Sequence, residues 1–500
     1  MNLRRLTARY TSHLLACVVV ITAVSYFYQV PQNPPGYYID EASISYNAYT
    51  ISQNLQDEYR TRLPLYFRAF GEYKNPVYIY LLALLFRLFG PSILVARLFS
   101  AMLGVLAAAL LWQLSFRVTQ RAIVASLIAL SALLTPWLFE NSRLVFEVAL
   151  YPALLTVFLL AVHRASLKKS WSAVDVVSLA LSLAFLTYSY SIGRLLAPLF
   201  ALGLIFFTTR TRVWAVFATW GAYVATLVPL LIFHMRHPGA LMTRFWLVTY
   251  VRPDGSMSEM AAEFFKRYLS NMNPWTMAVT GEVNVRDHVG TMGSILAPSL
   301  LIAVLGIVLV ILYRRREAFW KFMLYALVVA PIPASLTMTN FPQLRLVAMP
   351  VIGHVFMIPG AAWMLSDIVT ERNREAIRKV ALGFLMLLLI VQGLIYRSQF
   401  RKAGPERWYI FDEQFPREVL PMALAQKRSP IYFYDPPGKS GYIQAYWYGV
   451  LQHLPDSTFV RMAADEKPPA EAVIISTAEK CSDCRLLLKS INYIVYIATE

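Results

Sequence analysis

The chain is poor in charged side chains. Only 15% of its 500 residues are Asp, Glu, Lys or Arg, whereas 57% are hydrophobic. Soluble globular domains carry about 25% charged residues, so this composition excludes an ordinary soluble protein. Runs such as 18–28, 296–312 and 382–394 are apolar enough to lie in lipid, where only helices satisfy their own backbone groups. The composition predicts a polytopic α-helical membrane protein.

Cysteine and histidine are also scarce. Of the three cysteines, Cys17 lies in the predicted first helix, while Cys481 and Cys484 form a single CxxC motif. No second ligand pair accompanies this motif, which argues against zinc. On the oxidising side of a membrane a local disulfide is favoured over catalytic redox chemistry. The seven histidines show no metal spacing such as HExxH.

The sequence contains no nucleotide-binding loop, internal repeat or low-complexity tract. The formal net charge of +17 could suggest nucleic acid, but arginine and lysine gathered in cytoplasmic loops account for it in a membrane protein. The first apolar run follows Arg4, Arg5 and Arg9, as a signal peptide would. It lacks a clear small-residue cleavage site, so we predict a retained helix.

The positions of the basic clusters predict the orientation. Arg4, Arg5 and Arg9 favour a cytoplasmic N-terminus, which places the loop after the first span outside. Segment 76–89 is short for a span, which needs about 20 residues, and counting it would reverse the side of every later cluster. We therefore predict that it lies flat at the outer interface, which leaves about eleven spans. After the first run, these are 93–116, 122–138, 148–162, 174–190, 195–208, 213–233, 296–312, 319–338, 346–365 and 380–396.

The spans and the segments between and after them predict two domains. We expect a transmembrane domain over residues 1–397, with outer loops at 29–92 and 234–296 and short helices in the second loop. Residues 398–500 are expected to form a small extracytoplasmic soluble α/β domain. Its predicted strands are 430–434, 472–475 and 493–497, and its predicted helices are 417–426 and 442–454.

Acidic residues predicted to lie outside are candidates for chemistry. Asp40 and Glu41 follow the first span, either as solvated carboxylates at a helix start or as a general base for an attacking hydroxyl. Glu140 and Arg143 have the i, i+3 spacing of a structural pair. Glu147 stands further on, beside a span, where an acid is costly unless it is paired or functional.

Three basic residues, Lys74, Arg194 and Arg345, are also predicted to lie outside, each next to a span. Interfacial arginines often contact only lipid headgroups. Several of them converging on one cavity would instead clamp a phosphate, for which guanidinium has the matching geometry.

Together these segments resemble the GT-C class of glycosyltransferases that use polyprenyl-phosphate-linked sugars. The nearest branch is the protein O-mannosyltransferase-like proteins (glycosyltransferase family 39 type), with the aminoarabinose transferase of lipid A as a related family. The resembling segments are Asp40-Glu41, Glu72 to Tyr78, Leu88-Phe89-Gly90 with Arg97, Ser142-Arg143 with Glu147, Tyr188-Ser189-Tyr190 with Arg194, and Pro342 to Arg345 with Pro350.

The resemblance implies roles for these residues. Asp40 would be the catalytic base, with Glu41 as its acidic neighbour and Glu147 as a second acidic position. The donor's phosphate would be bound by Lys74, Arg143, Arg194 and Arg345. Two positions depart from the family pattern: Asn75 follows Lys74 where relatives often have proline, and Gln343 stands where many have histidine. A divalent metal is a candidate cofactor without assigned ligands.

The expected activity is transfer of a sugar, with inversion, from a polyprenyl-phosphate-linked donor to a hydroxyl of an extracytoplasmic protein, lipid or glycan. The expected location is the cell (plasma or inner) membrane, without a nucleic-acid partner. One alternative is a flippase or transporter of lipid-linked sugars, although transporters usually show repeated halves and polar residues at mid-membrane depth. The other is an O-antigen ligase or polymerase that moves whole oligosaccharides.

Overall fold

The computed structural model describes residues 15–290, 292–366, 372–463, 466–479 and 484–499. Cys481 lies outside these residues, so the interpretation of the CxxC motif stays a prediction. The described chain forms two compact units. The first contains the chain up to Tyr28, Ser100–Ser142 and Glu147–Phe400, and the second contains Gln29–Phe99, Arg143–Phe146 and the chain from Arg401. Each unit is described by itself below.

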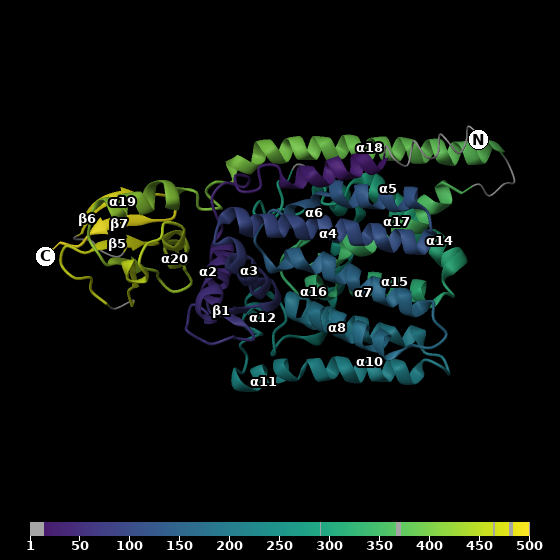
Figure 1. Cartoon of the computed structure of the whole chain (residues 1–500), viewed down its shortest axis with the longest axis horizontal. Coiled ribbons are helices and arrows are strands. Elements are labelled where there is room, and N and C mark those ends of the chain that lie inside the picture. Colours follow the sequence, from purple (N-terminus) through teal and green to yellow (C-terminus); the bar gives the residue numbers. More distant parts are fainter. Residues whose placement is uncertain (1–14, 291, 367–371, 464–465, 480–483, 500) are drawn as a thin grey trace. The chain divides into compact units, whose positions relative to one another are not determined.

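The first unit is helical. After Leu15–Phe27 it contains most of α4 (Ile93–Thr119) and of α18 (Arg372–Glu406). Its other helices are α5 (Ala122–Leu134), α6 (Pro136–Asn141), η2 (Glu147–Leu150), α7 (Tyr151–Ser166), α8 (Ala173–Ser189), α9 (Gly193–Gly203), η3 (Leu204–Phe207), α10 (Val213–Thr226), α11 (Val228–Arg236), α12 (Thr243–Val248), α13 (Met257–Asn271), η4 (Thr276–Thr280), α14 (Ala297–Leu309), η5 (Val310–Arg314), α15 (Ala318–Val329), α16 (Ile332–Ser335) and α17 (Ala348–Met364). Helices α7, α8 and α10 pack side by side, and α14 packs against α17 (Figure 1).

Six described helices are long and apolar enough to cross a membrane: Ile93–Thr119, Glu147–Ser166, Val213–Arg236, Ala297–Arg314, Ala318–Ser335 and Arg374–Glu406. The shorter apolar helices are Leu15–Phe27, Pro76–Phe89, Ala122–Leu134, Ala173–Ser189, Gly193–Phe207 and Ala348–Met364. These helices confirm the polytopic helical fold, and every predicted span coincides with one of them. Helix α18 is longer than the predicted span 380–396, because polar residues continue it at both ends.

Prolines decide where several of these helices begin. Pro136, Pro152 and Pro298 each occupy one of the first two positions of a helix, where the missing N–H would be unpaired in any case. Pro136 separates α6 from α5, with the extended residue Thr135 between them. The short helix α6 then carries Glu140 at a new angle, in a position that is 3% exposed.

The second unit begins with α2 (Ile39–Asn54), which packs against α3 (Pro76–Phe89). Between them lies an antiparallel hairpin of β1 (Phe67–Ala69) and β2 (Glu72–Lys74) that pairs Phe67 with Lys74. Gly71 sits in the turn at φ +79°, a left-handed conformation that glycine adopts without strain. Lys74 is therefore fixed at the end of a strand, directly before α3.

The C-terminal part of the second unit contains a five-stranded sheet in the order β4-β3-β5-β7-β6. Its elements are η6 (Phe415–Val419), α19 (Leu420–Ala425), β3 (Ile431–Tyr434), α20 (Tyr442–Leu451), η7 (Asp456–Thr458), β4 (Phe459–Arg461), β5 (Val473–Ser476), β6 (Arg485–Lys489) and β7 (Ile494–Ile497). Strand β3 is parallel to β4 and β5, whereas β7 is antiparallel to β5 and β6. The three buried strands were predicted, but β4 is too short and β6 too exposed to give a sequence signal. The predicted limits of the domains, 397 and 398, stay predictions.

Candidate functional site

Asp40 and Glu41 lie in the first turn of α2. The Glu41 carboxylate turns back and accepts a hydrogen bond from the Tyr38 backbone N–H at 2.9 Å, as the third residue of a capping box does. Acidic side chains in a first turn also interact favourably with the helix dipole. The local structure therefore fixes both acids at one helix start but directs them to different neighbours.

Glu41 is fully buried and paired with Arg97 of α4. The Nε and Nη2 atoms of Arg97 donate to the two Glu41 oxygens at 3.1 and 2.8 Å, and the Val145 backbone N–H donates to Oε1 at 3.0 Å. Arg97 also donates to the carbonyls of Pro34 and Gly36 at 2.6 and 2.9 Å. These contacts give Glu41 a structural role, and its predicted part in chemistry stays a prediction.

Asp40 has a different environment from Glu41. Its Oδ1 accepts a hydrogen bond from Lys74 Nζ at 2.6 Å. The Asp40 side chain is 26% exposed, whereas that of Lys74 is 8% exposed. The ammonium of Lys74 also lies 5.3 Å from the centre of the Phe70 ring. A partly exposed carboxylate thus stands beside a nearly buried cation, and the predicted catalytic roles of these two residues stay predictions.

Arg143 supports the same segment of the second unit. Its Nη2 donates to the backbone carbonyls of Gln29 and Asn33 at 2.7 and 2.9 Å, and its Nε donates to Asn33 at 3.2 Å. The side chain is buried, at 2% exposure. These contacts tie down the loop that leads to Asp40. The predicted contact of Arg143 with a donor phosphate stays a prediction.

The other predicted site residues belong to the first unit. Glu147 is partly exposed at the start of η2. Arg194 Nη1, from the first turn of α9, donates to the Leu241 carbonyl at 3.3 Å. Arg345 Nη1 donates to Thr337 Oγ1 at 3.3 Å. Because they fall in the first unit and Asp40 in the second, their convergence with Asp40 stays a prediction.

Arg345 lies close to two arginines that sequence analysis did not single out. Burial lowers the pKa of Arg345; Tyr190 opposes this effect, while the positive charges of Arg244 and Arg286 add to it. Glu282 acts on Arg345 in the opposite direction, and Arg286 is paired with Asp287 at 2.7 Å; guanidinium groups that converge on one point bind a phosphate. The sequence feature that could have indicated Arg286 is the run from Glu282 to His288, in which four of seven residues are ionisable.

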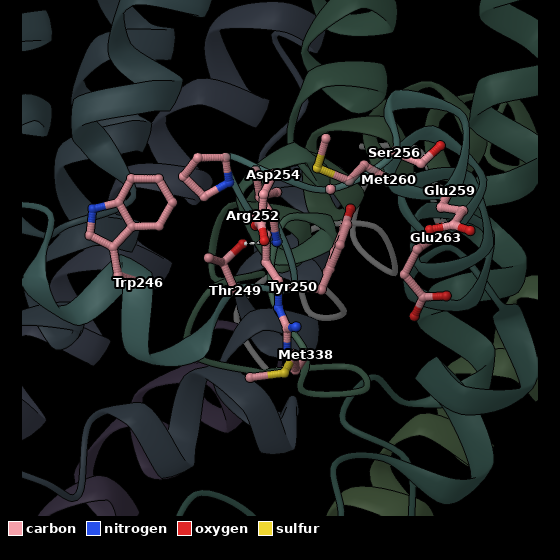
Figure 2. A pocket seen from close by; sticks show the side chains of 13 residues that line it. Trp246, Thr249, Tyr250, Arg252, Asp254, Ser256, Glu259, Met260, Glu263 and Met338 are labelled. Atoms are coloured by element: carbon pink, nitrogen blue, oxygen red, sulfur yellow. Dashed lines mark hydrogen bonds between the residues drawn. The ribbon is translucent and has the colours of Figure 1, made fainter.

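A hollow of about 760 Å³ opens in the first unit between Trp246, residues 249–256, helix α13 and Met338 (Figure 2). Its lining carries the carboxylates Asp254, Glu259 and Glu263 but only one cation, Arg252. Glu263 is engaged by Arg267 at 2.6 Å. Because acidic side chains repel an anion, we do not assign the donor phosphate to this hollow.

Among the described residues, no three His, Cys, Asp or Glu side chains gather in a way that could hold a metal ion. The candidate metal therefore still has no ligand set within the described ranges. The chemistry proposed below uses side chains of the chain itself.

Comparisons with known proteins show similarity in sequence and in fold. Residues 73–235 match the family model described as dolichyl-phosphate-mannose-protein mannosyltransferase. No curated protein matches the chain. The crystal structure of ArnT from Cupriavidus metallidurans bound to undecaprenyl phosphate aligns with a TM-score of 0.59 and 12% identity, covering 97% of this chain and 98% of that one. The same protein in the apo state gives 0.59 and 13%, covering 98% of both chains. The TM-scores show that the chains share a fold, and at identities this low the likeness is one of fold alone.

Proposed function

We infer that this chain is a membrane glycosyltransferase of the GT-C class, which takes its sugar from a polyprenyl-phosphate-linked donor and transfers it to a hydroxyl. Three observations support this donor. The family model that matches residues 73–235 is described by a lipid-phosphate-linked mannose, and the ArnT structure with the same fold holds undecaprenyl phosphate. The chain itself places Lys74 at the start of that matched region.

The observation that carries the proposal is the contact between Asp40 and Lys74, at 2.6 Å. A general base must be reachable by the acceptor, and a phosphate-binding cation must be held in place. Asp40 is partly exposed and Lys74 is nearly buried, which meets both needs. Glu41 does not compete for the role of base, since Arg97 and the backbone occupy its two oxygens.

In the proposed reaction the acceptor oxygen attacks the anomeric carbon of the sugar. The new carbon–oxygen bond forms as the bond from that carbon to the phosphate oxygen breaks, and the bonding pair leaves with the phosphate. The hydroxyl proton passes to a carboxylate oxygen of Asp40. Lys74 stabilises the negative charge that grows on the departing polyprenyl phosphate. A single displacement of this kind inverts the anomeric configuration.

The test is an assay with purified protein in proteoliposomes, whose two leaflets face separate compartments, and a polyprenyl-phosphate-linked sugar labelled in the sugar. We expect the label to appear on an acceptor hydroxyl with inverted configuration, together with free polyprenyl phosphate. A flippase would move the labelled donor across the bilayer intact. Label that crosses the membrane while its bond to phosphate survives would therefore overturn the proposal. Transfer of a preassembled oligosaccharide in preference to a single sugar would favour a ligase.

A further inference from the structure

Gln343 precedes Arg345 in the first unit, and every polar group of this residue is engaged. Its backbone N–H donates to Glu282 at 2.9 Å, and its carbonyl accepts from Trp137 Nε1 at 2.9 Å. Its side-chain oxygen accepts from Ser294 Oγ at 2.7 Å, and Nε2 donates to Glu140 Oε2 at 3.2 Å. Gln343 is fully buried. A buried residue with all its groups satisfied is held in one position.

Glu140 connects this residue to a second segment. One of its oxygens accepts from the Val289 backbone N–H at 2.9 Å, and the other lies 2.7 Å from His288 Nδ1. The opposite ring nitrogen of His288 lies 2.6 Å from the Met292 carbonyl oxygen. A carbonyl only accepts, so Nε2 must carry a proton. His288 is 0% exposed and Glu140 3% exposed, and a carboxylate on Nδ1 favours the doubly protonated ring.

The surrounding loop is shaped around this histidine. Gly281 has φ +65°, and a Cβ added there would lie 2.4 Å from His288 Nε2. Glu282 and Asp287 are also buried, at 4% and 3% exposure, and Asp287 is paired with Arg286 at 2.7 Å. The close approach of Gly281 leaves no room for a larger residue beside the ring.

The network joins two segments that each carry an arginine. Arg286 lies two residues before His288, and Arg345 lies two residues after Gln343. The charge of Arg286 lowers the pKa of Arg345 and that of Glu282 raises it, so both charges act on the Arg345 guanidinium. The two Asp287 oxygens accept from Arg286 at 2.7 and 2.8 Å and offset part of the repulsion between the two arginines. The hydrogen bonds that Glu140 accepts from His288 and Gln343 supply a restraint against the repulsion that remains.

We propose that Glu140 and His288 are positioning residues that hold the segments of Arg286 and Arg345 together, so that both guanidiniums meet the phosphate of the lipid-linked donor. The proposal rests on the proposed function for the identity of the anion. Neither positioning residue touches the phosphate. The two residues act through Gln343 and through residues 281–290 and 292–294.

The protonation of His288 makes this arrangement sensitive to pH. Burial lowers the pKa of His288. The charge of Glu140 and the hydrogen bonds to Glu140 and the Met292 carbonyl raise it by more, so the pKa lies above its ordinary value of 6.5. Glu282 also raises it. The protonated His288 ring therefore stabilises the network fully below about pH 6.5, and its contribution is lost as the pH rises through the raised pKa of His288.

The experiment uses the full chain in nanodiscs and measures the binding of undecaprenyl phosphate together with hydrogen exchange of the backbone. His288→Ala removes both hydrogen bonds, whereas His288→Asn keeps a donor for Glu140 without a charge. We expect His288→Ala to weaken binding about 10- to 100-fold, as is typical when a residue that orients the binding groups is removed, and to speed exchange in residues 281–290, 292–294 and 341–347. His288→Asn should recover part of the affinity. The ratio of its affinity to the wild-type affinity should rise with pH, because only the wild type loses a charge.

His234→Asn is the matched control, because His234 is exposed on α11. If Arg345→Ala weakens binding while both His288 variants bind as the wild type at every pH, the positioning proposal is wrong and the proposed donor stands. If neither Arg345→Ala nor His288→Ala alters binding but exchange still rises in both segments, the network is structural only. If the wild type does not bind the lipid, the donor assignment fails, and unchanged exchange in His288→Ala would overturn the network by itself.

Discussion

Arg97 holds both carboxylate oxygens of Glu41, at 3.1 and 2.8 Å, and neither side chain is exposed. Asp40, the next residue along the chain, is instead paired with Lys74 and is 26% exposed. Two adjacent acids of one helix turn therefore differ in what they can do. The buried one fixes the start of α2, and the partly exposed one is the acid that we propose as the general base.

Changing Asp40 tests the proposed base. Asp40→Asn keeps the size of the side chain but cannot accept a proton, so we expect the rate of sugar transfer to fall about 10²- to 10⁴-fold. The measurement is kcat with the lipid-linked donor, alongside the thermal midpoint of the purified protein. Asp456→Asn, at an exposed position of the same unit, is the control and should keep full activity. Full activity in Asp40→Asn would remove this residue from the mechanism.

Lys74 is expected to act mainly on the lipid-linked donor. Lys74→Met removes a charged hydrogen-bond donor worth about 1.5–3 kcal/mol, so we expect the affinity for polyprenyl phosphate to fall about 10- to 100-fold. Lys74→Arg should retain much of the affinity, because it keeps the charge. Binding isotherms of the two variants beside Lys439→Met, an exposed lysine of the same unit, provide the comparison. Equal affinity in all of them would exclude Lys74 from the phosphate site.

The pair of Glu41 and Arg97 is expected to determine stability. Glu41→Gln leaves the Arg97 guanidinium buried without its counter-charge, and breaking such a pair costs about 3–5 kcal/mol. The double change Glu41→Leu with Arg97→Met should recover most of this loss. Thermal unfolding in one detergent measures both. If Glu41→Gln unfolds as the wild type does but no longer transfers sugar, Glu41 has a catalytic role instead.

Asp412 should make stability depend on pH. Burial raises its pKa from 3.8 to about 6, although hydrogen bonds from Tyr493 and Asn492 oppose this. The folded chain therefore binds this proton more tightly than the unfolded chain does. Stability from this group is present below about pH 4 and is lost as the pH rises to about 6, by roughly 3 kcal/mol. The difference in thermal midpoint between wild type and Asp412→Asn, followed from pH 4 to 7, should trace this loss. A constant difference would refute it.

The predicted orientation can be tested by labelling single cysteines with an impermeant maleimide in intact cells. Arg68→Cys, Glu259→Cys and Lys439→Cys lie at exposed positions of the two outer loops and the C-terminal region, and we expect all three to react. Arg315→Cys, exposed in a basic cluster predicted to be cytoplasmic, should react only after the cells are opened. Labelling of Arg315→Cys in intact cells would reverse the orientation.

The sequence by itself determined the class of the protein. Apolar runs long enough to span lipid leave the backbone no option but helices, so the positions of the helices could be predicted from hydropathy. The three buried strands of the C-terminal sheet were equally visible as short apolar runs. The acidic pair and Lys74 were predicted as site residues because of their positions next to apolar segments.

The tertiary structure alone decided which side chains meet. Asp40 and Glu41 have the same local sequence signal, and only the packing of α4 against the loop before α2 gives Glu41 to Arg97. Glu140 lies 2.7 Å from His288, 148 residues away, a contact that no local spacing predicts. Hydropathy describes the preference of each residue for water or lipid and can be read along the sequence. Ion pairs between distant segments depend on which segments the tertiary fold brings together.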